Sequence, residues 1–169
     1  NIAAGLLAYK LGLPVKQFIA ATNINDTVPR FLESGIYETR PSVQTYANAM
    51  DVGAPSNWVR IMELFKQDIP ELKKMLKSYR YSDAETVQAI KDIYSRYNYV
   101  ACPHTAIAWL AAQAYQAAYP SADDTLVFLS TAHACKFPDV FPEDIAKAID
   151  SPAQVEELKR KEKSATHMN

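Results

Sequence analysis

The sequence predicts an α/β fold that is rich in helix and contains a few buried parallel strands. Two helix–strand units support this prediction. In the first, apolar residues at helical spacing run from Ile2 to Leu11, and the short apolar run 17–22 follows. In the second, a long apolar helix over 105–119 precedes the run 125–130. Because neither run alternates between apolar and polar residues, we expect both strands to be buried on two faces, as in a parallel sheet.

The remaining elements are predicted to be helices from start or stop signals in the sequence and, for residues 72–79, from an amphipathic pattern. In chain order they cover residues 27–34, about 55–65, 72–79, 82–97, 142–150 and 152–163. The capping box from Ser82 to Glu85 is one such signal. The stretch 37–54 is expected to be irregular, since it contains Pro41, Gly53 and many small polar residues.

Size and charge narrow the class of protein. A chain of 169 residues favours one compact domain. Its 18 basic and 19 acidic side chains give a formal net charge of -1, so we expect no nucleic-acid partner. The longest apolar stretch, 106–112, is far shorter than the roughly 20 residues that span a bilayer. With only two cysteines as well, the chain is expected to be soluble and cytoplasmic, with free thiols.

Three polar loops lie where ligands are expected in an open α/β sheet, outside the carboxyl ends of the strands. Two follow the predicted strands, at 23–26 and 131–133, and the third, 102–105, leads into the long helix. The free N–H groups at the start of that helix suit an anion or a polar ring atom.

Five segments in and around these loops resemble one family in order and in spacing. They are NIAAGLLAYKLGL at 1–13, FIAATNINDTVPR at 18–30, NAMDVGAPSN at 48–57, PHTA at 103–106 and TAHACKFPDV at 131–140. The family is threonine synthase, and the resemblance covers residues 1 to about 145. It implies the C-terminal part of the large domain of a fold type II pyridoxal-phosphate enzyme. On this interpretation residues 1–169 are one fragment, and the upstream half of the enzyme is absent.

The resemblance also implies an activity. Threonine synthases convert O-phosphohomoserine and water into L-threonine and phosphate with pyridoxal 5'-phosphate, so the parent enzyme would be a carbon–oxygen lyase of threonine biosynthesis. The Schiff-base lysine of the family lies upstream of this chain. No catalytic residue is therefore assigned, and the chain alone is expected to be inactive. The alternative is a stand-alone, non-catalytic domain that retains the fold for binding or assembly.

The resemblance implies cofactor contacts at Asn1 and Thr105. Asn1 matches the last residue of the family's phosphate loop and would lie against the cofactor phosphate at a helix start. Thr105 matches the residue that contacts the ring nitrogen of the cofactor. Its hydroxyl can donate a hydrogen bond to that nitrogen or accept one from it. Asn48 and Asp51 are candidates for the substrate pocket, although a turn in which Asp51 caps the next segment explains them equally well.

Several polar residues have a simpler interpretation beside a functional one. Asn23, Asn25 and Asp26 are expected to stabilise their loop and to cap the next helix. The pairs Cys102–His104 and His133–Cys135 could in principle hold zinc, as in a zinc-bound hydrolase. Zinc sites usually separate paired ligands by two to four residues, so we predict no metal and instead two buried thiols beside hydrogen-bonded histidines.

Two further expectations follow from the resemblance. Lys136 matches a family motif, but no role is assigned to it. Loss of the upstream half is expected to expose apolar surface, so that the fragment self-associates.

Overall fold

The structure, a computed structural model, describes residues 2–162, 164 and 166. Its helices are α1 (Ile2–Lys10), α2 (Thr27–Ser34), α3 (Trp58–Leu64), α4 (Ile69–Met75), α5 (Asp83–Tyr97), α6 (Pro103–Ala118), α7 (Glu143–Ala146) and α8 (Ala153–Lys159). The strands are β1 (Phe18–Thr22) and β2 (Leu76–Arg80), and short 3-10 turns are η1 (Asn48–Met50), η2 (Ala134–Lys136) and η3 (Pro138–Val140). The predicted α/β fold, rich in helix, is confirmed.

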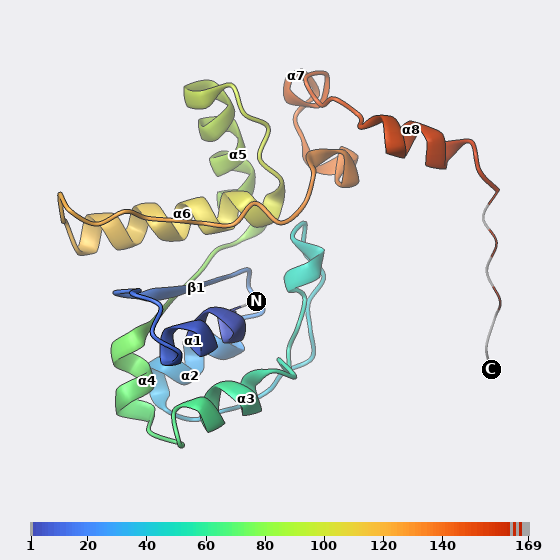
Figure 1. The fold of residues 1–169 in the computed structure, drawn as a ribbon. Helices are drawn as coiled ribbons and strands as arrows, with labels where there is room; N and C mark the ends of the chain where they lie inside the picture. The colour runs from blue at the N-terminus through green and yellow to red at the C-terminus, as the bar shows by residue number, and fades with distance from the viewer. Residues whose placement is uncertain (1, 163, 165, 167–169) are drawn as a thin grey trace.

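Strands β1 and β2 form a parallel two-stranded sheet, in which Phe18 is opposite Leu76 and Thr22 is opposite Arg80. Helix α6 contacts both strands, and so does α2. In Figure 1, β1 lies between α6 on one side and α1 and α2 on the other. The sheet is therefore covered by helices on both faces, as is usual for parallel strands.

Two clusters of buried apolar side chains hold the chain together. The first, which we call the α3–α4 core, lies among α1, α2, α3, α4 and β2 and comprises Leu6, Phe31, Trp58, Ile61, Met62, Phe65, Leu72, Met75 and Leu76. The second, the α5–α6 core, comprises Ala89, Ile90, Ile93, Ala101, Cys102, Ala106, Trp109, Ala134, Phe137, Phe141 and Ile145. It fixes the segment 134–145 against α5 and α6.

Local signals in the sequence set the ends of α5 and α6. In the predicted capping box at α5, the Ser82 hydroxyl accepts from the backbone N–H of Glu85, and the Glu85 carboxylate accepts from the backbone N–H of Ser82. Asn98 ends α5 in the left-handed conformation. Cys102 is the N-cap residue of α6, and Pro103 occupies its first position. The start of α6 is thus fixed beside the α5–α6 core.

Two predicted elements were wrong. The helix expected over 72–79 ends at Met75, and Leu76–Arg80 forms β2 instead, because parallel pairing with β1 outweighs the local helical pattern. The buried strand expected over 125–130 is not assigned to a strand and is largely exposed, with Val127 at 80% and Leu129 at 65%. Within the described residues this segment has no strand beside it to complete a ladder.

No described helix is both long and apolar enough to cross a membrane.

Candidate ligand site at the start of helix α6

The carboxyl end of β1 is held by a buried amide. Asn23, which directly follows β1, is only 1% exposed. Its Nδ2 donates to Thr45 Oγ1 at 2.8 Å and to Asp51 Oδ1 at 2.8 Å. Its Oδ1 accepts from the backbone N–H of Asn25 at 2.9 Å. These bonds tie the irregular stretch 40–53 to the end of the sheet.

Asp51 is the centre of this network. Its carboxylate accepts from the Thr45 backbone N–H at 3.0 Å and from the Thr45 hydroxyl at 2.8 Å. It also accepts from Nδ2 of both Asn23 and Asn25. A carboxylate with this many donors orders the loop, which agrees with the simpler interpretation of Asn23 and Asn25.

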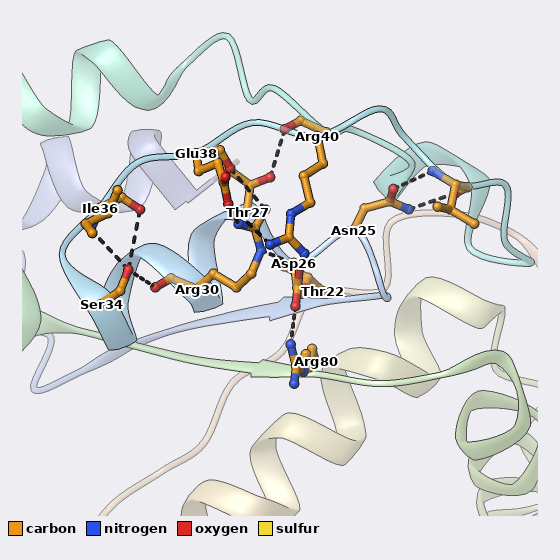
Figure 2. Close-up of polar contacts among 12 residues, drawn as sticks. Thr22, Asn25, Asp26, Thr27, Arg30, Ser34, Ile36, Glu38, Arg40 and Arg80 are labelled. Carbon is orange, nitrogen blue, oxygen red and sulfur yellow. Dashed lines mark hydrogen bonds and ion pairs between the residues drawn. The ribbon is translucent and has the colours of Figure 1, made fainter.

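Asp26 follows the same strand but does not act as predicted. It occupies the N-cap position of α2, yet its side chain makes no capping hydrogen bond. Its carboxylate accepts instead from Arg30 Nε at 2.9 Å and from Arg80 at the end of β2. Figure 2 shows Asp26 between these two arginines. Burial alone would raise the pKa of Asp26, but the two guanidinium groups more than offset that effect and lower the pKa.

His104 joins the start of α6 to η1. The backbone N–H of Ala49 donates to His104 Nε2 at 3.2 Å. Since Nε2 accepts this bond, a neutral ring carries its proton on Nδ1. The imidazole is 6% exposed and packs against Phe137 with ring centres 5.2 Å apart. Four parts of the chain therefore meet in one region: Asn23 at the end of β1, the turn η1, the start of α6 and the turn η2.

A second polar network lies one residue further along α6. Thr105, 1% exposed, donates from its hydroxyl to Ser130 Oγ at 3.1 Å. Thr105 Oγ1 lies 3.2 Å from Cys102 Sγ, and Ser130 Oγ lies 3.1 Å from the Tyr99 hydroxyl. The exposed segment 125–130 thus ends on the start of α6.

Thr105 also lines a cavity of about 410 Å³ between α5, α6 and the segment 124–128. Its other lining residues include Tyr99, Trp109 and Phe128. Small-molecule sites are usually apolar clefts of roughly 300–1,000 Å³ with a few polar groups. A cavity lined by Thr105 and by aromatic side chains fits that description and suits a heteroaromatic ring with a polar ring atom.

The residues predicted for the site do not all meet. Asn1 lies outside the described residues. Thr105 is buried in the hydroxyl network, and Asp51 is part of the separate network at β1. Asn48 is exposed on η1, beside the Ala49 contact with His104. Ser130 was missed; its only signal was its place as the first polar residue after an apolar run.

Both cysteines are free thiols, but they differ in burial. Cys102 is buried, as predicted, but Cys135 is only half-buried. His133 Nδ1 accepts from the Cys135 backbone N–H at 3.2 Å, an ordinary helix-capping contact. Among residues 2–162, 164 and 166, no group of three or more His, Cys, Asp or Glu side chains is placed to hold a metal ion.

The fold and the hydroxyl-lined cavity define an α/β chain with a candidate small-molecule site at the start of α6. Comparison with known proteins then identifies its relatives. Residues 105–169 match the family model for the C-terminal region of threonine synthase. Threonine synthase of Escherichia coli is 40% identical over 157 residues, which are 93% of this chain and 35% of that protein.

Solved structures agree with this result. Threonine synthase from Brucella melitensis, whose structure contains bound PLP, superimposes with a TM-score of 0.81 at 30% identity, covering 98% of this chain and 40% of that one. The yeast enzyme gives a TM-score of 0.84 at 28% identity, covering 96% and 41%. The chain spans little more than a third of the length of these relatives. Its predicted resemblance to the C-terminal portion of threonine synthase is confirmed.

Proposed function

We propose that this chain forms the C-terminal part of a pyridoxal-phosphate-dependent threonine synthase, which converts O-phosphohomoserine and water into L-threonine and phosphate. The observation that carries the proposal is the placement of Thr105. Its motif, PHTA, lies at the start of α6, and Thr105 is one of the residues that line a ring-sized cavity. The similarity to threonine synthases over nearly the whole chain supports the interpretation of Thr105 as a cofactor contact.

In this proposal the hydroxyl pair of Thr105 and Ser130 would hold the ring nitrogen of the cofactor. When bound, pyridoxal phosphate supplies a conjugated ring that accepts the electron pair released at the substrate carbon. Thr105 is well suited to orient that ring because its backbone is fixed in the first turn of α6 and its side chain is held by two neighbours. A hydroxyl, unlike a carboxylate, adds no full negative charge at the nitrogen.

The phosphate and substrate contacts are proposed on the adjoining elements. Asn1, with the first amides of α1, would lie against the cofactor phosphate, as helix starts favour anions. Asn48, exposed on η1, would contact the substrate. Asp51 would act through the loop that it orders. The Schiff-base lysine would come from the part of the enzyme that lies outside this chain, so the chain alone would not turn over substrate.

The exposed segment 125–130 supports a proposal about partners. Val127, Phe128 and Leu129 are 80%, 43% and 65% exposed. An extended apolar segment without a neighbour is a template for pairing with another chain. We expect the isolated chain to self-associate at high concentration, and Val127→Lys to reduce this. Gel filtration of both proteins is the measurement, and a wild-type monomer at every concentration would refute self-association.

Phosphate release from O-phosphohomoserine tests the proposed activity. It is measured with added pyridoxal phosphate for this chain alone and for the full-length product of its gene. Turnover only in the full-length protein supports the proposal, and Thr105→Val should then reduce kcat by at least about tenfold, the effect expected when one hydrogen bond to a charged or reacting group is lost. No turnover by either protein would leave a stand-alone binding or assembly domain as the better interpretation.

A further inference from the structure

Four groups form a continuous chain of hydrogen bonds, and two of their residues, Tyr99 and Thr105, line the cavity. In order they are the Tyr99 hydroxyl, Ser130 Oγ, Thr105 Oγ1 and Cys102 Sγ, separated by 3.1, 3.1 and 3.2 Å. Each group carries one proton at most and can also accept. Because each proton can be donated to only one neighbour, the direction of the hydrogen bond at one end of this chain of groups limits the directions of the other bonds.

Cys102 is the buried end of this chain. It is 1% exposed and is the N-cap residue of α6, a helix of 16 residues. Burial alone would raise the pKa of the Cys102 thiol, but the nearby imidazole of His104 and the hydrogen bonds from the side chain and backbone of Thr105 more than offset that effect and lower the pKa to about 7. The thiol therefore changes its charge near neutral pH.

The geometry of His104 also bears on the charge of this sulfur. Its Nε2 accepts from the Ala49 N–H, which leaves the ring proton on Nδ1. Nδ1 is buried and has no hydrogen-bond partner within the described residues. A buried donor without a partner is costly, and the neighbouring thiolate of Cys102 is the acceptor that would relieve it.

The surroundings of Cys102 contain few other groups that titrate. The α5–α6 core around it is otherwise apolar, with Tyr94 at its edge. Apart from His104, the titratable group nearest along the chain of hydrogen bonds is Tyr99, two hydroxyls away. The titratable groups to be distinguished within this described network are therefore Cys102, His104 and Tyr99, and variants of Cys102 separate the first from the other two.

We propose that Cys102 is a positioning residue whose ionisation decides which neighbour receives the hydrogen bond donated by the Thr105 hydroxyl. As a thiol, Cys102 donates to Thr105, and Thr105 donates onward to Ser130 or to a ligand nitrogen. As a thiolate, Cys102 accepts the hydrogen bond of the Thr105 hydroxyl, which keeps its proton, and Thr105 then offers only lone pairs to the ligand. The inference rests on the proposed function, because the ligand in question is the ring nitrogen of the cofactor.

The consequence is a dependence on pH at the ring nitrogen. With a thiolate at Cys102, Thr105 can accept only from a nitrogen that carries a proton, and the negative charge nearby favours that proton too. With a thiol, Thr105 can donate to a bare nitrogen. Cys102 thus adjusts how strongly the bound ring attracts electrons, without touching the ring itself.

The first experiment follows the ultraviolet absorbance of the thiolate as pH is raised, in this chain as it stands. We expect a transition near neutral pH in the wild type and in Cys135→Ser, the matched control, and its loss in both Cys102→Ser and Cys102→Ala. Thr105→Val should move the midpoint up by about one pH unit, since one donor to the thiolate is removed. A neutral transition that survives in both Cys102 variants, or a midpoint unmoved in Thr105→Val, overturns the inference.

The second experiment records the absorption spectrum of the full-length protein with pyridoxal phosphate across the same pH range. We expect a spectral change near neutral pH that is lost in both Cys102 variants and kept in Cys135→Ser. A bound cofactor whose pH dependence is the same in all of them overturns the role of Cys102 alone. Full-length protein that shows no cofactor band at any pH overturns the proposed function as well.

Discussion

The two predicted helix–strand units of this chain share an apolar pattern but lie in different environments. In the first, α1 leads to β1, which pairs with β2 and is half-buried along its whole length. In the second, α6 leads to the segment 125–130, which pairs with no described strand and is mostly exposed. An apolar run therefore does not by itself predict a buried strand, because burial needs a neighbouring strand that the run does not specify.

The largest expected difference is between two leucines, one in β2, the strand that pairs with β1, and one in the segment 125–130. Leu76 in β2 is 1% exposed in the α3–α4 core, whereas Leu129 is 65% exposed. Leu76→Ala should lower the free energy of unfolding by about 2 to 5 kcal/mol, because it removes buried methyl groups and leaves a cavity. Leu129→Ala should change it by less than about 0.5 kcal/mol. Urea unfolding of both variants is the measurement, and equal losses would show that the segment 125–130 is packed in solution.

The next largest effect is expected at the carboxyl end of the first unit. The residue after β1, Asn23, is fixed by Asp51 and Thr45. Asp51→Ala should cost about 2 to 3 kcal/mol, since it leaves the buried amide of Asn23 and the hydroxyl of Thr45 short of an acceptor. Asn48→Ala, at an exposed position of the same loop, is the matched control and should cost less than about 0.5 kcal/mol. Similar losses in both would mean that Asp51 does not order the loop.

A charged contact holds the strand ends of the first unit, and its effect should depend on pH. The lowered pKa of Asp26 means that its stabilising contribution is present above the pKa of an unfolded aspartate, about 3.9, and is lost as pH falls through the lower folded value. Asp26→Asn should therefore cost about 1 to 2 kcal/mol at neutral pH and almost nothing in strong acid.

Thermal or urea unfolding at the two pH values measures this effect. Glu38→Gln is the control, because Glu38 contacts the same Arg30 from a side chain that is 62% exposed and should matter by less than about 1 kcal/mol. A loss for Asp26→Asn that is the same in strong acid would exclude the ion pairs as its cause.

The smallest expected effect is at the end of the second unit. Ser130→Ala removes the bonds that Ser130 makes to Thr105 and Tyr99, and Tyr99→Phe removes only the second. Because Ser130 and Tyr99 are both exposed, each change should cost no more than about 1 kcal/mol. Calorimetry on both variants is the measurement, and a larger loss for Tyr99→Phe than for Ser130→Ala would contradict the order of the chain of bonds.

Much of the fold could be predicted from local signals. The capping box at Ser82 placed the start of α5, and Gly35 placed the end of α2. The sequence of β2 could not be assigned in this way. Lys77, Ser78 and Tyr79 continue a pattern that suits a helix as well as a strand, and only the ladder with β1, distant in sequence, decides between them.

The candidate site was predicted less completely. Thr105 could be found because its motif resembles a known family, and its burial beside a cavity agrees with that interpretation. Ser130 could not be found, since a serine after an apolar run resembles any other loop residue until the fold brings it to 3.1 Å from Thr105. The roles of Asp26 and Asp51 likewise depend on partners that lie far along the chain, Arg80 for Asp26 and Asn23 for Asp51.

The register between β1 and β2 bears on how the chain reaches its native state. Phe18 must find Leu76, so α2, α3 and α4 all lie within the loop that this pairing closes. Contacts between residues so distant in sequence form slowly, because the entropy of closing the loop is lost before the ladder forms. Until then both β1 and the segment 125–130 are open to other chains, so refolding yield should fall as protein concentration rises and as temperature favours encounters between unfolded molecules.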